Sequence, residues 1–284
     1  MIDKVGIVGC GVMGAGLAES CARAGLDVKV AVTRPASAEA GLARIRRSLE
    51  RAVSRGKLSE PDRDAALGKI SFTADLLDFE DRQLVIETVP EDEATKLDIF
   101  SQLDKVVQDP EAILASNTSS IPIARLAAVT SAPERVIGLH FFNPVQVLAL
   151  VEVISSLVTA QSVRERAEEF VTGVLGKEIV SSPDRAGFVV NGLLVPYLLG
   201  AVRVVESGFS TASEVDRGMT LGCAHPMGPL ALIDLIGADV VVHVARALYN
   251  EYGEPLYAPP PLLVRMVESG LLGKKSGRGF YSYE

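Results

Sequence analysis

Near its start the chain reads Val5-Gly6-Ile7-Val8-Gly9-Cys10-Gly11-Val12-Met13-Gly14. An apolar strand runs into the pattern G-x-G-x-x-G and the pattern opens a helix, which is the context that a dinucleotide-binding turn requires. Gly9 would allow the tight turn, Gly11 the approach of a pyrophosphate, and Gly14 the packing of helix on strand. A plain glycine turn is the alternative. The context favours dinucleotide binding by Gly9, Gly11, Val12, Met13 and Gly14, with the phosphates at the helix N-terminus.

Short apolar runs alternate with amphipathic stretches from this turn to about residue 155. The expected strands are Val5–Val8, Val28–Val32, Leu84–Ile86, Ile113–Ala115, Val136–Leu139 and Val147–Val153. The expected helices cover residues 14–24, 36–55, 91–107 and 121–128. Several of the strands lack polar alternation, as buried parallel strands do. The alternation of strand and helix predicts an α/β fold with a Rossmann-type, doubly wound sheet.

The character of the sequence changes after the segment Ser181–Gly187, where helical periodicity punctuated by glycine and proline takes over. We predict a dinucleotide-binding domain over residues 1–183 and a smaller all-helical domain over residues 184–284 that binds substrate and forms a dimer. The helix beginning near Gly187 is apolar on nearly all sides. Such a helix must be covered by its own domain or by a second subunit, and we expect a homodimer through this half.

The composition limits the class of protein. The chain has 284 residues, of which 48% are hydrophobic and 23% charged, so a mainly disordered or fibrous chain is excluded. Lys and Arg number 28, and Asp and Glu number 36, so the net charge is −8. That charge repels nucleic acid and anionic membranes, and we expect neither as a partner.

Cysteine usage and the N-terminus favour a cytoplasmic protein. The three cysteines are Cys10, Cys21 and Cys223. Their spacing suggests neither a disulfide framework nor a zinc cluster, and we expect no metal site. The first residues lead directly into a strand, unlike a signal peptide. The most apolar long stretch, Phe188–Val205, contains an asparagine, a proline and an arginine, so we interpret it as a buried helix rather than a membrane span.

The end of the second expected strand bears on the choice of dinucleotide. A carboxylate about 20 residues beyond the turn would bind the ribose 2′-hydroxyl of NAD. Val32 occupies that position and is followed by Thr33 and Arg34. A hydroxyl and a guanidinium suit a 2′-phosphate, because arginine binds phosphate through a forked pair of donors. We therefore favour NADP over NAD, with Arg34 as a solvated loop residue the alternative.

A histidine and a glutamate form the candidate chemical centre. His140 follows the strand that ends at Leu139, and a residue at the carboxyl edge of such a sheet faces the cofactor crevice. Glu152 lies in an apolar run, where a carboxylate is costly unless it is paired. Pairing would fix the imidazole tautomer and stabilise the cation formed during proton transfer. The alternative to a pair is that His140 is a core histidine with its own hydrogen-bond partners and that Glu152 faces the edge of the sheet.

Several motifs together resemble the 3-hydroxyacyl-CoA dehydrogenase family, in its stand-alone short-chain form. They are Gly9–Gly14, Ala115-Ser116-Asn117-Thr118-Ser119-Ser120, Gly138-Leu139-His140-Phe141-Phe142-Asn143-Pro144, Gly187–Asn191, His225–Pro229 and Gly273–Tyr281. They follow one order over nearly the whole chain, which is far more specific than any single motif. The resemblance implies the expected two-domain fold and an oxidoreductase acting on 3-hydroxyacyl-CoA.

The resemblance also implies catalytic roles by position. His140 matches the family's base and Glu152 its acidic partner. Ser119 matches the serine that hydrogen-bonds the 3-oxygen of the substrate, and Asn191 matches the asparagine that helps to position substrate near the nicotinamide. Ser119 could instead cap the helix that follows it. Asn191 could instead be a polar residue that is hydrogen-bonded within a buried helix.

Further positions match residues of the cofactor crevice, namely Glu91, Lys96 and Asn117. Two positions depart from the family. Gln146 and Ala149 stand where the family usually has a proline and often a lysine, in a stretch that the resemblance puts close to the acyl thioester. This departure could alter acyl selectivity or change the carrier from coenzyme A to an acyl carrier protein.

A basic cluster follows the second expected strand. Its members are Arg44, Arg46, Arg47, Arg51 and Arg55. It could receive the phosphates of coenzyme A or an acidic carrier protein, and a solvated helix face is the alternative.

These observations predict an enzyme that interconverts 3-hydroxyacyl-CoA, in particular 3-hydroxybutyryl-CoA, and 3-oxoacyl-CoA by hydride transfer with NAD(P). The same chemistry on a hydroxyacyl group held by an acyl carrier protein is one alternative. A non-catalytic nucleotide-binding or structural protein that retains the fold is the other.

Overall fold

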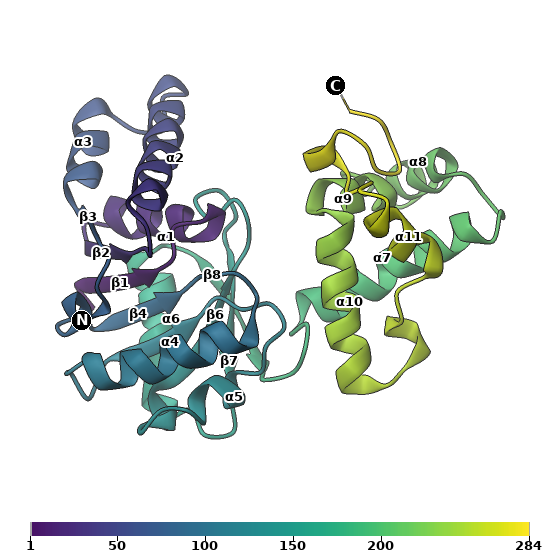
Figure 1. Cartoon of the computed structure of the whole chain (residues 1–284). Helices are drawn as coiled ribbons and strands as arrows, with labels where there is room; N and C mark the ends of the chain where they lie inside the picture. The colour runs from purple at the N-terminus through teal and green to yellow at the C-terminus, as the bar shows by residue number, and fades with distance from the viewer. Residues whose placement is uncertain (1, 284) are drawn as a thin grey trace. The chain divides into compact units, whose positions relative to one another are not determined.

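The structure is a computed structural model that describes residues 2–283. It divides into two compact units, residues 1–185 and 186–284. In Figure 1 the first unit, purple to teal, contains a sheet with helices on its faces, and the second, green to yellow, is built from helices. The predicted fold class is confirmed. We placed the boundary at residue 183, and the roles of the second domain in substrate binding and dimerisation stay predictions.

One sheet forms the centre of the first unit, with the strand order β3-β2-β1-β4-β5-β6-β7-β8. The strands are β1 (Lys4–Val8), β2 (Asp27–Ala31), β3 (Ile70–Thr73), β4 (Leu84–Glu87), β5 (Ile113–Ser116), β6 (Val136–Phe141), β7 (Leu150–Ser155) and β8 (Glu178–Pro183). Neighbouring strands are parallel except β6 and β7, which are antiparallel. The reversal of order between β2 and β4 on the two sides of β1 is the crevice where doubly wound sheets bind ligands.

Helices cover the sheet. They are α1 (Val12–Arg23), α2 (Pro35–Ser54), α3 (Glu60–Gly68), α4 (Glu93–Val106), α5 (Ile123–Ala127) and α6 (Gln161–Glu169), with the short turns η1 (Leu76–Phe79), η2 (Pro133–Arg135) and η3 (Phe170–Val174). The apolar side chains of β1, β4 and β5 are fully buried against them. That burial explains why these strands lack polar alternation.

The structure corrects the sequence prediction at several elements. We did not predict β3, β8, α3 or α6. β3 and β8 are edge strands whose side chains are largely half-buried or exposed, so they give no continuous apolar run. The expected strand Val147–Val153 was placed too early, because Val147 and Leu148 are exposed in a loop and β7 begins only at Leu150.

The second unit is helical. Its elements are α7 (Val190–Glu206), α8 (Ala212–Gly222), α9 (Pro229–Ile236), α10 (Ala238–Tyr252), η4 (Pro255–Tyr257), α11 (Pro261–Glu268) and η5 (Lys274–Ser276). The apolar faces of α7 and α10 pack together around Leu198, Val202 and Leu248. Leu193 of α7 stays 74% exposed, so the second unit's own core covers only part of this helix.

Among the described residues, no helix combines the length and the hydropathy needed to cross a membrane. The same residues contain no group of three or more His, Cys, Asp or Glu side chains arranged to hold a metal ion.

Candidate active site

The glycine turn has the backbone that the motif requires. Gly9 has a φ of 96°, a left-handed conformation that favours glycine. A Cβ on Gly14 would lie 2.1 Å from the carbonyl oxygen of Gly9, so only glycine allows α1 to start this close to β1. A Cβ on Gly11 would meet no atom within 4 Å. The backbone at Gly11 is therefore open to a ligand.

Thr88 holds this turn in place and was missed by the sequence analysis. It follows β4, and its hydroxyl lies 3.0 Å from the carbonyl oxygen of Val8 and 3.1 Å from that of Gly9. Its backbone N–H also donates to Val8 at 2.8 Å. The available signal was its place at the carboxyl end of a buried strand next to β1.

A cavity of about 1120 Å³ lies beside the turn. Its lining includes Gly9, Gly11, Val12, Met13, Val32, Thr33, Ser37, Arg44, Asp75 and residues of α4. The volume, the open backbone at Gly11 and the N-terminus of α1 fit a dinucleotide. Burial raises the pKa of the Cys10 thiol in this turn to about 11, against an opposing effect of Arg44, so the thiol stays neutral.

The residues at the end of β2, where the adenosine ribose would lie, differ in whether they face the cavity and in charge. Thr33 and Val32 line the cavity, whereas Arg34 is an exposed residue at the N-cap of α2 and is absent from the lining. Arg44, about three turns further along α2, also lines the cavity and donates to the carbonyl oxygen of Cys10 at 3.1 Å. Asp75 adds a carboxylate, so the lining contains both signs of charge.

His140 and Glu152 form the pair that we predicted as a possibility. They are directly opposite each other in the antiparallel ladder of β6 and β7, which turns both side chains to the same face. The distance between Nδ1 of His140 and Oε2 of Glu152 is 2.7 Å. Glu152 is fully buried and His140 is 7% exposed. A carboxylate in this position would hold the imidazole in the tautomer with Nδ1 protonated.

Two contacts fix the backbone and ring around His140. The ring of Phe142 lies 4.6 Å from the imidazole, centroid to centroid, at an interplanar angle of 57°. The side-chain oxygen of Asn117 accepts a hydrogen bond from the N–H of Phe141 at 2.9 Å. Asn117 thereby ties the residue after His140 to the loop that follows β5, while its expected contact with the cofactor stays a prediction.

Glu91 organises the loop that carries Ser119. Its Oε1 accepts from Thr118 Oγ1, from the N–H groups of Ser119 and Ser120 and from Ser120 Oγ at distances of 2.5 to 3.1 Å. Burial by itself would raise the pKa of Glu91, but Lys96 and these hydrogen bonds outweigh it and hold the pKa below its ordinary value. The Ser119 hydroxyl lies 3.4 Å from the same oxygen, which leaves it a longer and weaker bond than its neighbours have.

Lys96 is buried and turned toward carboxylates. Its Nζ lies 2.7 Å from Oε1 of Glu87 at the end of β4 and 3.4 Å from Oε2 of Glu91. Glu87 also accepts from the hydroxyl of Ser116 at 2.7 Å. Because Lys96 is only 1% exposed, these contacts make it a support of Glu91, and direct contact with a cofactor stays a prediction.

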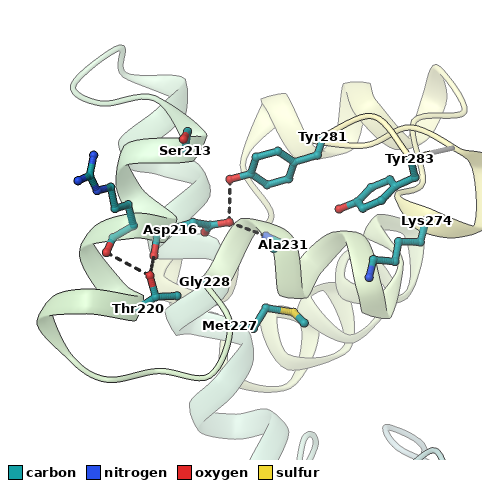
Figure 2. A pocket seen from close by; sticks show the side chains of 10 residues that line it. Ser213, Asp216, Thr220, Met227, Gly228, Ala231, Lys274, Tyr281 and Tyr283 are labelled. Carbon is teal, nitrogen blue, oxygen red and sulfur yellow. Dashed lines mark hydrogen bonds between the residues drawn. The ribbon is translucent and has the colours of Figure 1, made fainter.

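Asn191 lies in the first turn of α7, in the second unit, and its expected contact with substrate stays a prediction. The same unit has a cavity of about 490 Å³ between α8, α9 and the C-terminal residues, shown in Figure 2. Asp216 accepts there from the hydroxyl of Tyr281 at 2.8 Å and from the N–H of Ala231 at 2.9 Å. These bonds tie the 273–281 motif to the helical core, which indicates a structural role for that motif.

A dinucleotide turn and a histidine–carboxylate pair on one parallel-sheet edge define a nicotinamide-dependent dehydrogenase. Two family models match the chain, "3-hydroxyacyl-CoA dehydrogenase, NAD binding domain" over residues 4–185 and "3-hydroxyacyl-CoA dehydrogenase, C-terminal domain" over residues 187–283. The chain therefore belongs to the 3-hydroxyacyl-CoA dehydrogenase family. The resemblance found in the sequence is confirmed, and the protein is an oxidoreductase with an NAD-binding domain.

Similar proteins cover the chain from end to end. The 3-hydroxybutyryl-CoA dehydrogenase of Mycobacterium tuberculosis is 59% identical over 282 residues, which is 99% of each chain. The crystal structure of FadB2 from the same organism has a TM-score of 0.99 and covers 100% of this chain and 99% of that one. The (S)-3-hydroxybutyryl-CoA dehydrogenase of Ralstonia eutropha is 43% identical, with a TM-score of 0.96 and complete coverage of both chains.

Proposed function

We propose that the protein interconverts 3-hydroxybutyryl-CoA and 3-oxobutyryl-CoA. The main support is the 2.7 Å contact between His140 and Glu152 at the carboxyl edge of the sheet. A nicotinamide nucleotide held at the turn of Gly9, Gly11 and Gly14 would supply hydride to C3 of the oxo substrate, or accept it in oxidation. Protonated His140 donates the proton to the developing alkoxide in reduction, and neutral His140 removes it in oxidation. An imidazole serves both directions because its protonated form donates a proton and its neutral form accepts one.

Two further side chains complete the proposed chemistry. The Ser119 hydroxyl donates to the 3-oxygen, where negative charge develops. The support is its 3.4 Å bond to Glu91, which is weak enough to be exchanged for a bond to substrate. Asn191 orients the substrate, a role that rests on the family resemblance. Steady-state reduction of 3-oxobutyryl-CoA tests the whole proposal, and a protein inert toward it with both NADH and NADPH would contradict it.

We infer further that NADPH is the preferred nucleotide. The support is the absence of a carboxylate at residues 32–34, the hydroxyl of Thr33 on the cavity wall and the guanidinium of Arg34 at the N-cap of α2. The N-terminus of α2 has no acidic residue in its first turn, so its dipole favours a phosphate.

Arg34→Ala is expected to raise the KM for NADPH by roughly 10- to 150-fold, since a charge-assisted bond contributes about 1.5–3 kcal/mol. The KM for NADH should stay unchanged. Steady-state kinetics with both cofactors measure this, and Arg46→Ala, also exposed on α2, is the matched control. A wild-type enzyme that prefers NADH would overturn the inference.

A carrier-protein substrate is the second candidate function. Arg46, Arg47, Arg51 and Arg55 are exposed on or just after α2 and form a basic surface on an acidic protein. Such a surface suits an acidic carrier protein. Inertness with 3-oxobutyryl-CoA together with turnover of the carrier-bound group would favour this candidate over coenzyme A.

We also propose a cytoplasmic homodimer formed through the second unit. The cysteines described are free thiols, as in a reducing compartment. In the second unit Leu193, Phe209 and Leu221 are 74%, 87% and 74% exposed, which is unusual for large apolar side chains. Phe209→Asp is expected to shift the protein from dimer to monomer in light scattering after size exclusion. The matched change Leu77→Asp in the first unit, at a side chain 66% exposed, should leave the dimer intact.

A further inference from the structure

The loop of residues 142–149 joins the strand that carries His140 to the strand that carries Glu152. Lys177, just before β8, reaches over to this loop. Its Nζ donates to the carbonyl oxygen of Val145 at 2.6 Å and to that of Leu148 at 2.7 Å. One ammonium group therefore binds two backbone carbonyls three residues apart and closes the loop on itself.

Two weaker anchors hold the same loop to the helices. The amide of Gln146 donates to the hydroxyl of Ser48 on α2 at 2.9 Å. Val145 is 2% exposed and packs on α1 at Gly16, where a Cβ would lie 3.0 Å from the Cβ of Val145. The position where the family usually has proline thus carries a polar link to α2 in this chain.

Lys177 is the charged anchor of the loop, and its side chain is half-buried. Within the described residues it forms no ion pair, so both bonds of its ammonium group go to neutral carbonyl oxygens. Burial lowers its pKa below the ordinary lysine value. A half-buried cation that binds backbone carbonyls rather than a carboxylate indicates that the charge stabilises the conformation of the loop.

The loop matters because it starts at Phe142, whose ring lies against the imidazole of His140. Glu152 holds that imidazole at Nδ1, and Phe142 limits its rotation from the side. A loop that moved would release Phe142 while leaving the bond to Glu152 possible.

We propose that Lys177 is a positioning residue that holds the 142–149 loop and so keeps Phe142 against His140. The proposal rests on the proposed function, in which the imidazole exchanges the proton with substrate. A shift of about 1 Å at a reacting group can cost 10²-fold in rate.

Lys177→Met keeps the aliphatic stem and removes the ammonium group. We expect kcat for 3-oxobutyryl-CoA to fall about 10- to 100-fold, the KM for the nucleotide to stay unchanged, and Lys177→Arg to recover most of the loss. The matched control is Lys29→Met, because Lys29 also donates to a backbone carbonyl, that of Asp78 at 2.9 Å, but on β2. A wild-type kcat in Lys177→Met would overturn the proposal. So would a fall in kcat in Lys177→Arg or in Lys29→Met as large as the fall in Lys177→Met.

A second readout does not depend on turnover. The three histidines His140, His225 and His243 give few ring signals in NMR spectra of histidine-labelled protein, and His140→Gln assigns the signals of His140. Lys177→Met should shift or broaden those signals and leave the other two histidines unchanged. An enzyme inert toward 3-oxobutyryl-CoA with this NMR change would reject the function and keep the positioning role. Unchanged His140 signals in Lys177→Met would reject the positioning role.

Discussion

Replacing His140 with glutamine is expected to lower kcat for 3-oxobutyryl-CoA reduction by roughly 10²- to 10⁴-fold, the usual contribution of general acid–base catalysis. Glutamine can still donate a hydrogen bond to Glu152, whose Oε2 lies 2.7 Å from the imidazole. It cannot carry the proton to the 3-oxygen. The loss should therefore appear in kcat and not in the folding of the sheet.

The measurement is steady-state turnover together with nucleotide binding by fluorescence titration. The dissociation constant for the reduced nucleotide should match wild type, because His140 lies on β6 and the glycine turn follows β1, with β4 and β5 between these two strands in the sheet. His243→Gln, an exposed histidine on α10, is the matched control and should keep full activity. Full turnover in His140→Gln would exclude the imidazole as the proton carrier.

Glu152→Gln should have the next largest effect, a fall in kcat of roughly 10²-fold or more. The substitution keeps the volume in a fully buried position and removes the charge. The imidazolium that forms during oxidation then loses its counter-ion in a poorly solvated site, where such an interaction is strong. The amide can also present a donor to Nδ1, which would select the wrong tautomer of His140.

Comparison with Glu178→Gln isolates this effect. Glu178 is exposed at the start of β8, one strand from Glu152. Its variant should retain wild-type kcat and thermal stability. If Glu152→Gln turned over 3-oxobutyryl-CoA at the wild-type rate, the carboxylate would have only a structural part. A drop in melting temperature without a drop in kcat would lead to the same conclusion.

Local sequence was sufficient for the elements around the nucleotide turn. The apolar run of β1, the glycine spacing and the start of α1 lie within 20 residues, and each depends only on neighbours in the chain. The edge strands β3 and β8 were not predictable in this way, because their pairing with β2 and β7 stabilises segments whose own pattern is weak.

In the candidate site, too, the sequence identified some residues, and the structure alone revealed their contacts. Sequence named His140, Glu152, Ser119 and Glu91, and it proposed the pairing of His140 with Glu152 while leaving open that each is satisfied separately. It also could not show that Glu91 accepts from Thr118 and Ser120, since these residues are almost 30 positions apart. Thr88 and Lys177 were not found, because a threonine and a lysine next to strands are common and carry no signal until the bonded partner is known.

The amino-acid order alone therefore specified a Rossmann-type domain, its nucleotide turn and the residue types of a hydroxyacyl dehydrogenase, because periodicity and short motifs are local properties. Only the folded chain brought His140 opposite Glu152, since the antiparallel register of β6 and β7 depends on hydrogen bonds between strands. Folding likewise decided that Lys96 supports Glu91 and that Lys177 closes the loop beside His140. Contacts of that kind are set by packing across the sheet, which no stretch of sequence contains.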